Sequence, residues 1–404
     1  MKYQVYAFIV LCFISFRGHA ERDSVLTLDT NDVFYSLEDG SSTSVDRKAW
    51  HIAFTLANRD VSILINEGNG VELFLASSNT ADWPRFDTTG MSWDNLYNSP
   101  DVWEEGAFNT AATGPHPDYG WGSYNAITHA INESRFFVIK LGDGSYKKIK
   151  INTMSAAGEY SFTYSNLDGS SELTKSIDKS DYSAKNFVYF NLESGVAIDE
   201  EPLSNSWDLV FTKYVAEIQA GPSLSYYPVS GIKVNKNLKI AKREAVLASS
   251  DDTTGLNWES SITTIGYDWK SFNRTTFQYD IQDSLAFLVK NNIGEVWKLV
   301  FTGYEGSGQG KYSFEKTKIS EGGQPTGLGN MEGLEVKVYP NPSKGKLHFS
   351  NEVISFQLFN MSGQLLHSSY GLQISVDVSS LEAGSYIAVY KTEESSYRSR
   401  LIIE

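Results

Sequence analysis

The strongest constraint on the fold of this 404-residue chain is a long stretch that occurs twice. Residues 118–164 are repeated, in the same order of features, by residues 266–314. The matching pairs are Tyr119 and Tyr267, Trp121 and Trp269, Ser123 and Ser271, Asn125 and Asn273, Lys140 and Lys290, Gly144 and Gly294, Gly158 and Gly310, and Tyr160 and Tyr312. Self-similarity at about one domain length predicts two homologous units.

One difference between the two copies stands out. His129 in the first copy stands opposite Phe277 in the second. Imidazole binds metals and protons, whereas a phenyl ring does neither. The difference therefore indicates a chemical role for the first copy that the second copy lacks.

Short strands with turns dominate the rest of both copies. Residues 146–151 and 296–301 alternate polar and apolar side chains, the period of a half-buried strand. Residues 92–107 are the exception, because their composition predicts a short helix before Pro100 and another after it. We therefore expect an all-β fold with one or two short helices, in antiparallel units at 27–166 and 184–319.

The two ends of the chain have compositions of their own. Residues 1–20 have the charged start, apolar run and small-residue cleavage site of a signal peptide, and they contain Cys12, the single cysteine. The mature chain is thus expected to lack thiols and transmembrane segments. Gly and Pro at 320–334 predict a linker. The net charge of -15 argues against a nucleic-acid partner.

A family resemblance lies in the repeated stretch. The segments W-x-x-Y-N, T-H-x-I, V-I-K-x-x-D-G-x-Y-x-K-I and G-x-Y-x-F, together with the strands that follow Trp50 and Trp207, resemble the HmuY family. These are secreted or surface haem-binding proteins of Bacteroidetes. The resemblance covers most of residues 30–319 as two tandem units. It implies capture of haem or a related porphyrin for iron acquisition, without catalysis.

The last segment, 335–404, resembles a different family. Tyr339-Pro340-Asn341-Pro342, the Asn and Gly turn at 359–363, and residues 377–386 resemble the type A C-terminal sorting domain of type IX secretion. Short strands between Pro, Gly and Asn turns predict a small Ig-like β-sandwich here. The resemblance implies export across the outer membrane, removal of the tail by a sortase, and a protein that is secreted or attached to the cell surface.

The haem interpretation selects candidate site residues. His129 would be an axial ligand, since haem iron takes His or Met ligands in an aromatic cleft. Trp121 and Tyr124 would form walls for the macrocycle, with Tyr119 beside them. Met154 is the preferred second ligand, and His116 is the other candidate. His51 replaces the Asp that follows the equivalent strand tryptophan (Asp208), and is expected to serve the fold.

Two further classes of function remain for comparison. No nucleophile motif, zinc motif or phosphate-binding glycine loop occurs, so the chain is not expected to be an enzyme. A surface adhesion module or a carbohydrate- or protein-binding module could use the same fold. Such a module would expose its aromatic rings as a platform and bury His129. A TonB-dependent receptor is implied as a partner by resemblance alone.

Overall fold

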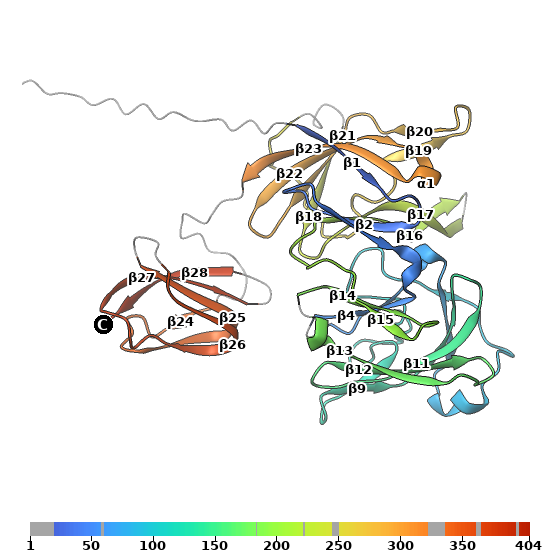
Figure 1. The fold of residues 1–404 in the computed structure, drawn as a ribbon, viewed down its shortest axis with the longest axis horizontal. Coiled ribbons are helices and arrows are strands. Elements are labelled where there is room, and N and C mark those ends of the chain that lie inside the picture. The colour runs from blue at the N-terminus through green and yellow to red at the C-terminus, as the bar shows by residue number, and fades with distance from the viewer. Residues whose placement is uncertain are drawn as a thin grey trace, which may run out of the picture. The chain divides into compact units, whose positions relative to one another are not determined.

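The computed structural model describes residues 20–404 except 58–59, 183, 221–222, 245–249, 322–335, 361–364 and 393–395. The signal peptide with Cys12 and almost all of the 320–334 linker therefore lie outside the described residues. The chain divides into two compact units, one through Gly322 and one from Gly323 (Figure 1). Both consist almost entirely of antiparallel strands, which confirms the predicted all-β class.

The larger unit contains two lobes, each built from two facing sheets. In the first lobe a four-stranded sheet, in the order β15 (Val196–Ile198), β14 (Phe187–Asn191), β4 (Ile52–Thr55), β5 (Ile63–Ile65), covers an eight-stranded sheet. The larger sheet comprises β13 (Leu173–Asp178), β12 (Glu159–Asn166), β11 (Tyr146–Met154), β10 (Phe136–Lys140), β6 (Glu72–Ser77), β7 (Asn95–Leu96) and the hairpin β8 (Gly122–Asn125) and β9 (Ala130–Glu133). Apolar side chains from both sheets form one core.

The second lobe repeats this arrangement. Its four-stranded sheet has the order β17 (Ser223–Val234), β16 (Leu209–Ala220), β2 (Asn31–Tyr35), β3 (Ser42–Asp46). Its other sheet has the order β1 (Glu21–Leu26), β23 (Lys311–Glu321), β22 (Glu295–Tyr304), β21 (Leu285–Lys290), β18 (Lys239–Glu244), and a separate hairpin joins β19 (Lys270–Asn273) to β20 (Gln278–Ile281). A second core fills the space between these sheets.

The two lobes exchange strands. β2 lies early in the chain, yet it pairs with β16 of the second lobe, and β14 lies late, yet it pairs with β4 of the first lobe. In the sequence repeat β2 corresponds to β14 and β4 to β16, so the exchange is reciprocal. Figure 1 shows these four strands together in the middle of the larger unit. Each lobe is thus built from segments that are not consecutive in the chain.

The exchanged pairs share one register. Tyr35 faces Leu209 across β2 and β16, and Phe190 faces Ile52 across β14 and β4. The carboxylate of Asp208 accepts a hydrogen bond from the Leu37 N–H at 2.7 Å. At the equivalent place, Nδ1 of His51 accepts from the Leu192 N–H at 3.1 Å. His51 is buried and serves the fold, as its position in the repeat suggested.

The helix prediction for residues 92–107 was wrong. This segment contains β7 and turns, and its polar groups bond to other segments instead of to a helix ladder. The Asn98 side chain accepts from the Ile65 N–H at 3.0 Å, and the indole N–H of Trp103 donates to the Val234 carbonyl at 2.9 Å. Short 3-10 turns occur elsewhere: η1 (Arg47–Ala49), η2 (Glu67–Asn69), η3 (Thr80–Arg85) and η4 (Lys179–Tyr182). A single α-helical turn, α1 (Gly306–Gln309), closes the loop between β22 and β23.

The smaller unit is a separate five-stranded antiparallel sheet with its own core. It contains β24 (Val338–Tyr339), β25 (Lys346–Asn360), β26 (Leu365–Asp377), β27 (Gly384–Lys391) and β28 (Ser396–Ile403). Phe349, Phe356 and Tyr390 pack in its interior. Within the described residues of the whole chain, no helix has the length and apolar character needed to cross a bilayer.

Candidate functional site

His129 lies in the turn of the β8–β9 hairpin. Its backbone N–H donates to the Asn125 carbonyl at 2.8 Å, and its φ angle is 55°. The Asn125 side chain accepts from the N–H groups of Ile127 and Thr128, which fixes the turn in the way that Asx residues stabilise turns. His129 is exposed, and the neighbouring Ile127 is 91% exposed. The turn therefore presents an imidazole and an aliphatic side chain to solvent.

A tyrosine orients this imidazole. The Tyr124 hydroxyl lies 2.7 Å from Nδ1 of His129. When Nδ1 donates its hydrogen to this hydroxyl, Nε2 keeps the lone pair that a metal ion needs. Metal-binding histidines in proteins are commonly fixed in this way through the ring nitrogen that faces away from the metal. The pair Tyr124–His129 thus has the chemistry of an anchored ligand.

His116 reaches the same tyrosine from a different loop. Its ring centroid lies 5.3 Å from that of Tyr124 and 5.9 Å from that of Tyr119. His116 is exposed, whereas the two tyrosines are half-buried. Two histidines from separate segments therefore meet around one tyrosine at the surface of the first lobe.

A partly buried ion pair holds the loop that carries His116. Both carboxylate oxygens of Asp118 accept from the Arg135 guanidinium at 2.7 Å, and Asp118 also accepts from the Gly120 N–H at 2.9 Å. The hydrogen bonds from Arg135 hold the pKa of Asp118 well below its usual range. A bidentate pair of this kind is geometrically specific. It fixes residues 113–120 against the start of β10, and its two residues lie 17 positions apart and form no local motif that would have predicted the pair.

The other predicted ligand and wall residues lie in the core. Trp121 is fully buried, and its indole N–H donates to the Val61 carbonyl at 3.1 Å. Met154 is 8% exposed and packs among core residues of the first lobe. Met154 pairs with Ile131 across β11 and β9, so its backbone is near His129 while its side chain points to the core. Of the four predicted site residues, the structure brings Tyr124 and His129 into contact.

The second lobe has the same hairpin with different chemistry. The Phe277 N–H donates to the Asn273 carbonyl at 2.8 Å, and the φ angle of Phe277 is 56°. Phe272 replaces Tyr124, and its ring centroid is 6.4 Å from that of Phe277. Phe277 is 79% exposed. The turn geometry is therefore common to both lobes. At these two positions the first lobe has the hydroxyl and imidazole of Tyr124 and His129, whereas the second lobe has two phenyl rings.

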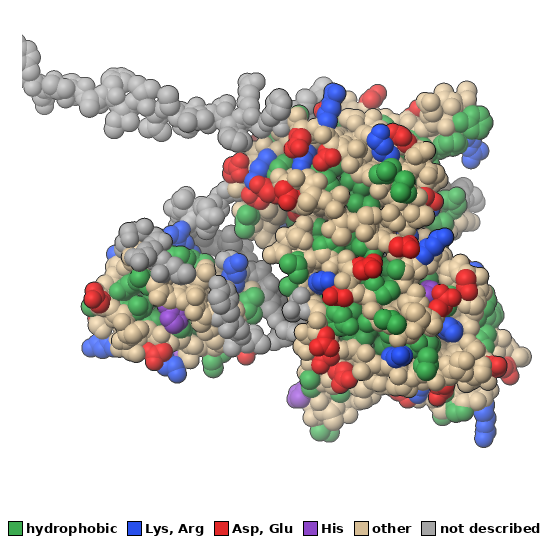
Figure 2. Space-filling view, in the orientation of Figure 1, with side chains coloured by type: hydrophobic (Ala, Val, Ile, Leu, Met, Phe, Trp, Pro, Cys, Tyr) green, Lys and Arg blue, Asp and Glu red, His purple; other side chains and the backbone are tan. Residues whose placement is uncertain are grey.

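Charged side chains are spread across the larger unit. On the face shown in Figure 2, acidic and basic side chains are interspersed with tan polar surface, and no continuous basic area is visible. Among the described residues there is no group of three or more His, Cys, Asp or Glu side chains arranged to hold a metal ion. The hairpin site contributes two histidines and no further side chain of these types to such a group.

Comparison with known families defines the class of protein. Residues 29–164 match the family described as HmuY protein, and residues 337–404 match the secretion system C-terminal sorting domain. The chain is thus an exported protein of the cell surface, with a HmuY-type region followed by a type IX sorting domain. The HmuY family is one of binding proteins, and the expectation that this chain is not an enzyme stays a prediction. A second HmuY unit at 184–319 stays a prediction from the sequence, because the family match covers only residues 29–164.

Two other comparisons add little. A search of curated proteins finds no match. Among solved structures, a match is found to PorZ of Porphyromonas gingivalis, described as an essential bacterial surface component of the type-IX secretion system. The identity is 14%, the match covers 70% of this chain and 41% of PorZ, and the TM-score is 0.18. At that score the two chains share no demonstrated fold.

Proposed function

We propose that the first lobe captures haem at the β8–β9 hairpin, where His129 and His116 would hold its iron. The observation that carries this proposal is the meeting of two exposed histidines around Tyr124. His116 takes the place of Met154, whose thioether is directed into the core. Each of these histidines would offer an imidazole nitrogen to the iron.

The residues at the hairpin fit haem in their donor chemistry. Tyr124 fixes the His129 ring and leaves Nε2 available, and Arg135 fixes the loop of His116 through Asp118. Ile127 and the ring faces of Tyr119 and Tyr124 offer apolar and aromatic surface for the flat macrocycle. This surface is open, so binding would rest on the two imidazoles and one-sided stacking.

This role places the protein in haem or porphyrin acquisition outside the cell. A captured haem has to be passed on for its iron to be used, and a TonB-dependent outer-membrane receptor is the proposed recipient. The type IX machinery and its sortase are the proposed partners for export, since the tail matches that sorting domain. Neither step requires a catalytic group in this chain.

A titration with ferric haem tests the proposal. The chain from Glu21 onward is expected to give a sharp Soret band that saturates at one haem per chain. His129→Phe is the sharpest variant, because Phe277 occupies the same position in the second lobe with the same backbone conformation. We expect this variant and His116→Ala to shift and weaken the band.

Two controls separate the ligands from the fold. Phe277→Ala alters the equivalent turn and should leave the Soret band unchanged. Met154→Leu keeps the core filled and removes the thioether, so it should also leave the band unchanged. A band lost in Met154→Leu and kept in His116→Ala would assign the second ligand to Met154. A spectrum identical to free haem in the unaltered chain would refute haem capture.

A non-haem binding role is the alternative, and the second lobe favours it. The equivalent hairpin exposes Phe272 and Phe277, which touch edge to face and offer apolar surface to a partner. Binding through this hairpin would be lost in a Phe272→Ser/Phe277→Ser variant and kept in His129→Phe. The two roles are therefore distinguishable in one set of variants.

A further inference from the structure

A cavity lies between the two lobes, away from the hairpin site. The outer faces of the two four-stranded sheets meet here, and Trp103 packs against apolar residues of both. The cavity has a volume of about 70 Å³. A single water molecule needs about 10–15 Å³ on this measure, so the space holds roughly five water-sized groups. It is far too small for a porphyrin.

The walls of the cavity follow the sequence repeat. Its lining includes residues that hold equivalent positions in the two copies: Phe34 and Tyr189, Trp50 and Trp207, Ala53 and Val210, Leu64 and Lys233. The pairing of Ala53 with Leu64 and of Val210 with Lys233 confirms the last two equivalences. Three of these pairs are apolar on both sides. The fourth places a lysine where the other lobe has a leucine.

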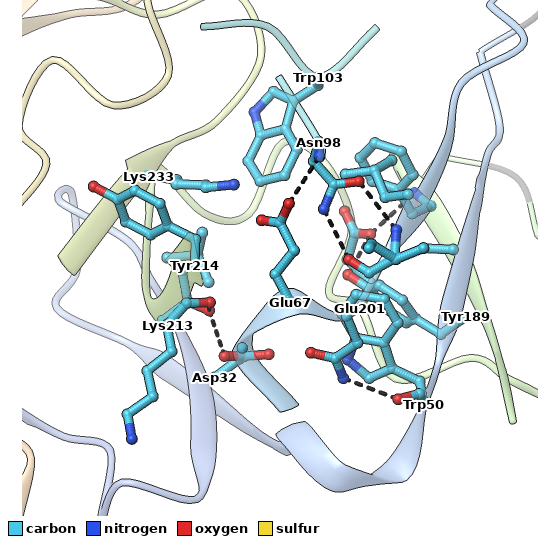
Figure 3. Close-up of a pocket in the computed structure, with 18 of the residues that line it drawn as sticks. Asp32, Trp50, Glu67, Asn98, Trp103, Tyr189, Glu201, Lys213, Tyr214 and Lys233 are labelled. Atoms are coloured by element: carbon cyan, nitrogen blue, oxygen red, sulfur yellow. Dashed lines mark hydrogen bonds between the residues drawn. The ribbon is translucent and has the colours of Figure 1, made fainter. Parts of the chain in front are cut away.

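Lys233 is the unusual member of this lining. It is 6% exposed, and its ammonium group lies 5.3 Å from the Trp103 ring centroid and 4.9 Å from that of Tyr214. Within the described part of the chain its Nζ has no hydrogen-bond acceptor and no ion pair within 4.0 Å. Figure 3 shows this side chain extended toward the centre of the site, on the side where Glu67 and Trp103 lie. A buried ammonium has three donors that need acceptors.

Glu67 faces the same space with acceptor capacity to spare. One carboxylate oxygen accepts from the Asn98 N–H at 2.8 Å, and the other from the Val215 N–H at 3.4 Å. Each oxygen of a carboxylate has two lone pairs, so a further donor can be accepted. An added anion would lose its hydration in this low-dielectric site and would lie beside the acidic side chains of Glu67 and Glu201, so it is disfavoured. The ligand should therefore be neutral, with one acceptor and one donor.

We propose that this cavity binds the acetamido group of an N-acetylated ligand. The carbonyl oxygen accepts from the Lys233 ammonium, the amide N–H donates to the Glu67 carboxylate, and the methyl group packs on the aromatic walls. The four non-hydrogen atoms of an acetamido group match the space available. The sources of such a group include an N-acetyl amino sugar and an N-acetylated peptide end.

Calorimetric titration of the chain from Glu21 onward tests the proposal with three probes. N-acetyl-D-glucosamine and N-acetylglycinamide both carry the group, and D-glucose lacks it. We expect at least one N-acetylated probe to bind, at millimolar concentrations, and D-glucose not to bind. Binding of the sugar alone or of the peptide analogue alone identifies the source. Absence of binding by both N-acetylated probes overturns the proposal.

The repeat supplies the matched variant. Lys233→Leu introduces the residue type that the first lobe has at the equivalent position, Leu64, so this variant is expected to fold. Lys233→Met is a second replacement, which keeps a long unbranched side chain. Both should weaken binding of the N-acetylated probe at least tenfold. Lys290→Leu is the control, since Lys290 also lies over a tryptophan ring, that of Trp258, elsewhere in the second lobe. Equal binding by Lys233→Leu and the unaltered chain would refute the proposal.

The site is independent of the proposed haem site. His129→Phe should leave binding of the N-acetylated probe unchanged, and Lys233→Leu should leave the Soret band of added haem unchanged. Failure of either proposal is therefore visible without reference to the other.

Discussion

At the scale of single residues, His129 and Phe277 show one backbone conformation with two different consequences. Both have φ angles near 55°, in the left-handed region that costs a residue with a Cβ atom roughly 1–2 kcal/mol. His129 gains a hydrogen bond to Tyr124 in that conformation. Phe277 gains an edge contact with Phe272 and leaves most of its ring in water. Retained strain of this kind points to a surface role for the Phe277 ring.

Phe277→Asn is therefore expected to stabilise the protein. Asparagine adopts the left-handed conformation with less strain, so the free energy of unfolding should rise by about 1 kcal/mol. Urea denaturation measures this change. His129→Asn should show no such gain, because it also removes the contact with Tyr124. An unchanged or lower stability of Phe277→Asn would show that its backbone is not strained.

Glu201 gives the stability a dependence on pH. It accepts hydrogen bonds from the N–H groups of Asn186 and Phe187 and from the Tyr189 hydroxyl. Burial nevertheless raises the pKa of Glu201 from 4.5 to about 7. Between pH 4.5 and about 7, the folded state thus keeps a proton on Glu201 that the unfolded state has released. The stability contributed by protonated Glu201 is complete below pH 4.5 and is lost as the pH rises through about 7.

The expected loss across this window is on the order of 3 kcal/mol at most. Urea denaturation at a series of pH values should show it in the unaltered chain. Glu201→Gln has no proton to lose, so its stability should change less over the same range. If the free energy of unfolding changed with pH by the same amount in both proteins, Glu201 would not be the source of the pH dependence.

At the scale of elements, the loop that carries His116 depends on one ion pair. Asp118→Asn leaves the buried Arg135 guanidinium without its carboxylate partner. Such a change costs about 3 kcal/mol or more in fully buried pairs, and we expect a smaller cost here because Asp118 is partly exposed. We expect a lower midpoint of thermal unfolding and weaker haem binding, because His116 loses its fixed position. Asp168→Asn, at an exposed turn in the same lobe, is the matched control. Unaltered haem affinity in Asp118→Asn would exclude a positioning role for this pair.

Strand positions were well predicted because their signals are local. The alternating segments at 146–151 and 296–301 lie within β11 and β22, and the strands after Trp50 and Trp207 begin at Ile52 and Leu209. The helix prediction for residues 92–107 failed because the polar residues there make their hydrogen bonds to distant strands, as Asn98 does with Ile65. Distant partners leave no periodic trace in the sequence.

The candidate site was predicted in part for a related reason. His129 was found because the repeat supplies its own reference, Phe277. Alternation does not reveal which face of β11 is covered, so the burial of Met154 was missed. The strand exchange was missed because β2 and β14 are equivalent in sequence, and each pairs in the same register with its own partner, β16 or β4. Lys233 stands where the first copy has Leu64, and this difference between the copies was a sequence signal for the cavity that went unrecognised.

At the scale of the whole molecule, the exchange of β2 and β14 makes each lobe depend on the other. A fragment of residues 21–182 keeps β4 and lacks β14, so the edge of its four-stranded sheet is unpaired. Two such fragments can satisfy each other by pairing β2 of one with β4 of its partner, in the manner of a domain swap. We expect this fragment to be a dimer in size-exclusion chromatography with light scattering, and residues 21–321 to be a monomer. A folded monomeric fragment would show that β2 can close its own lobe.

The exchange also changes what a break in the backbone would do. A protein at the outside of a cell meets proteases, and exposed connections are cut first. If the chain were cut between β13 and β14, β2 would still be hydrogen-bonded to β16, and β14 to β4. The two fragments would stay associated through these strand pairs. A nicked molecule would therefore elute at the size of the intact chain until it is denatured. The chain thus needs no disulfide to hold its halves together after cleavage.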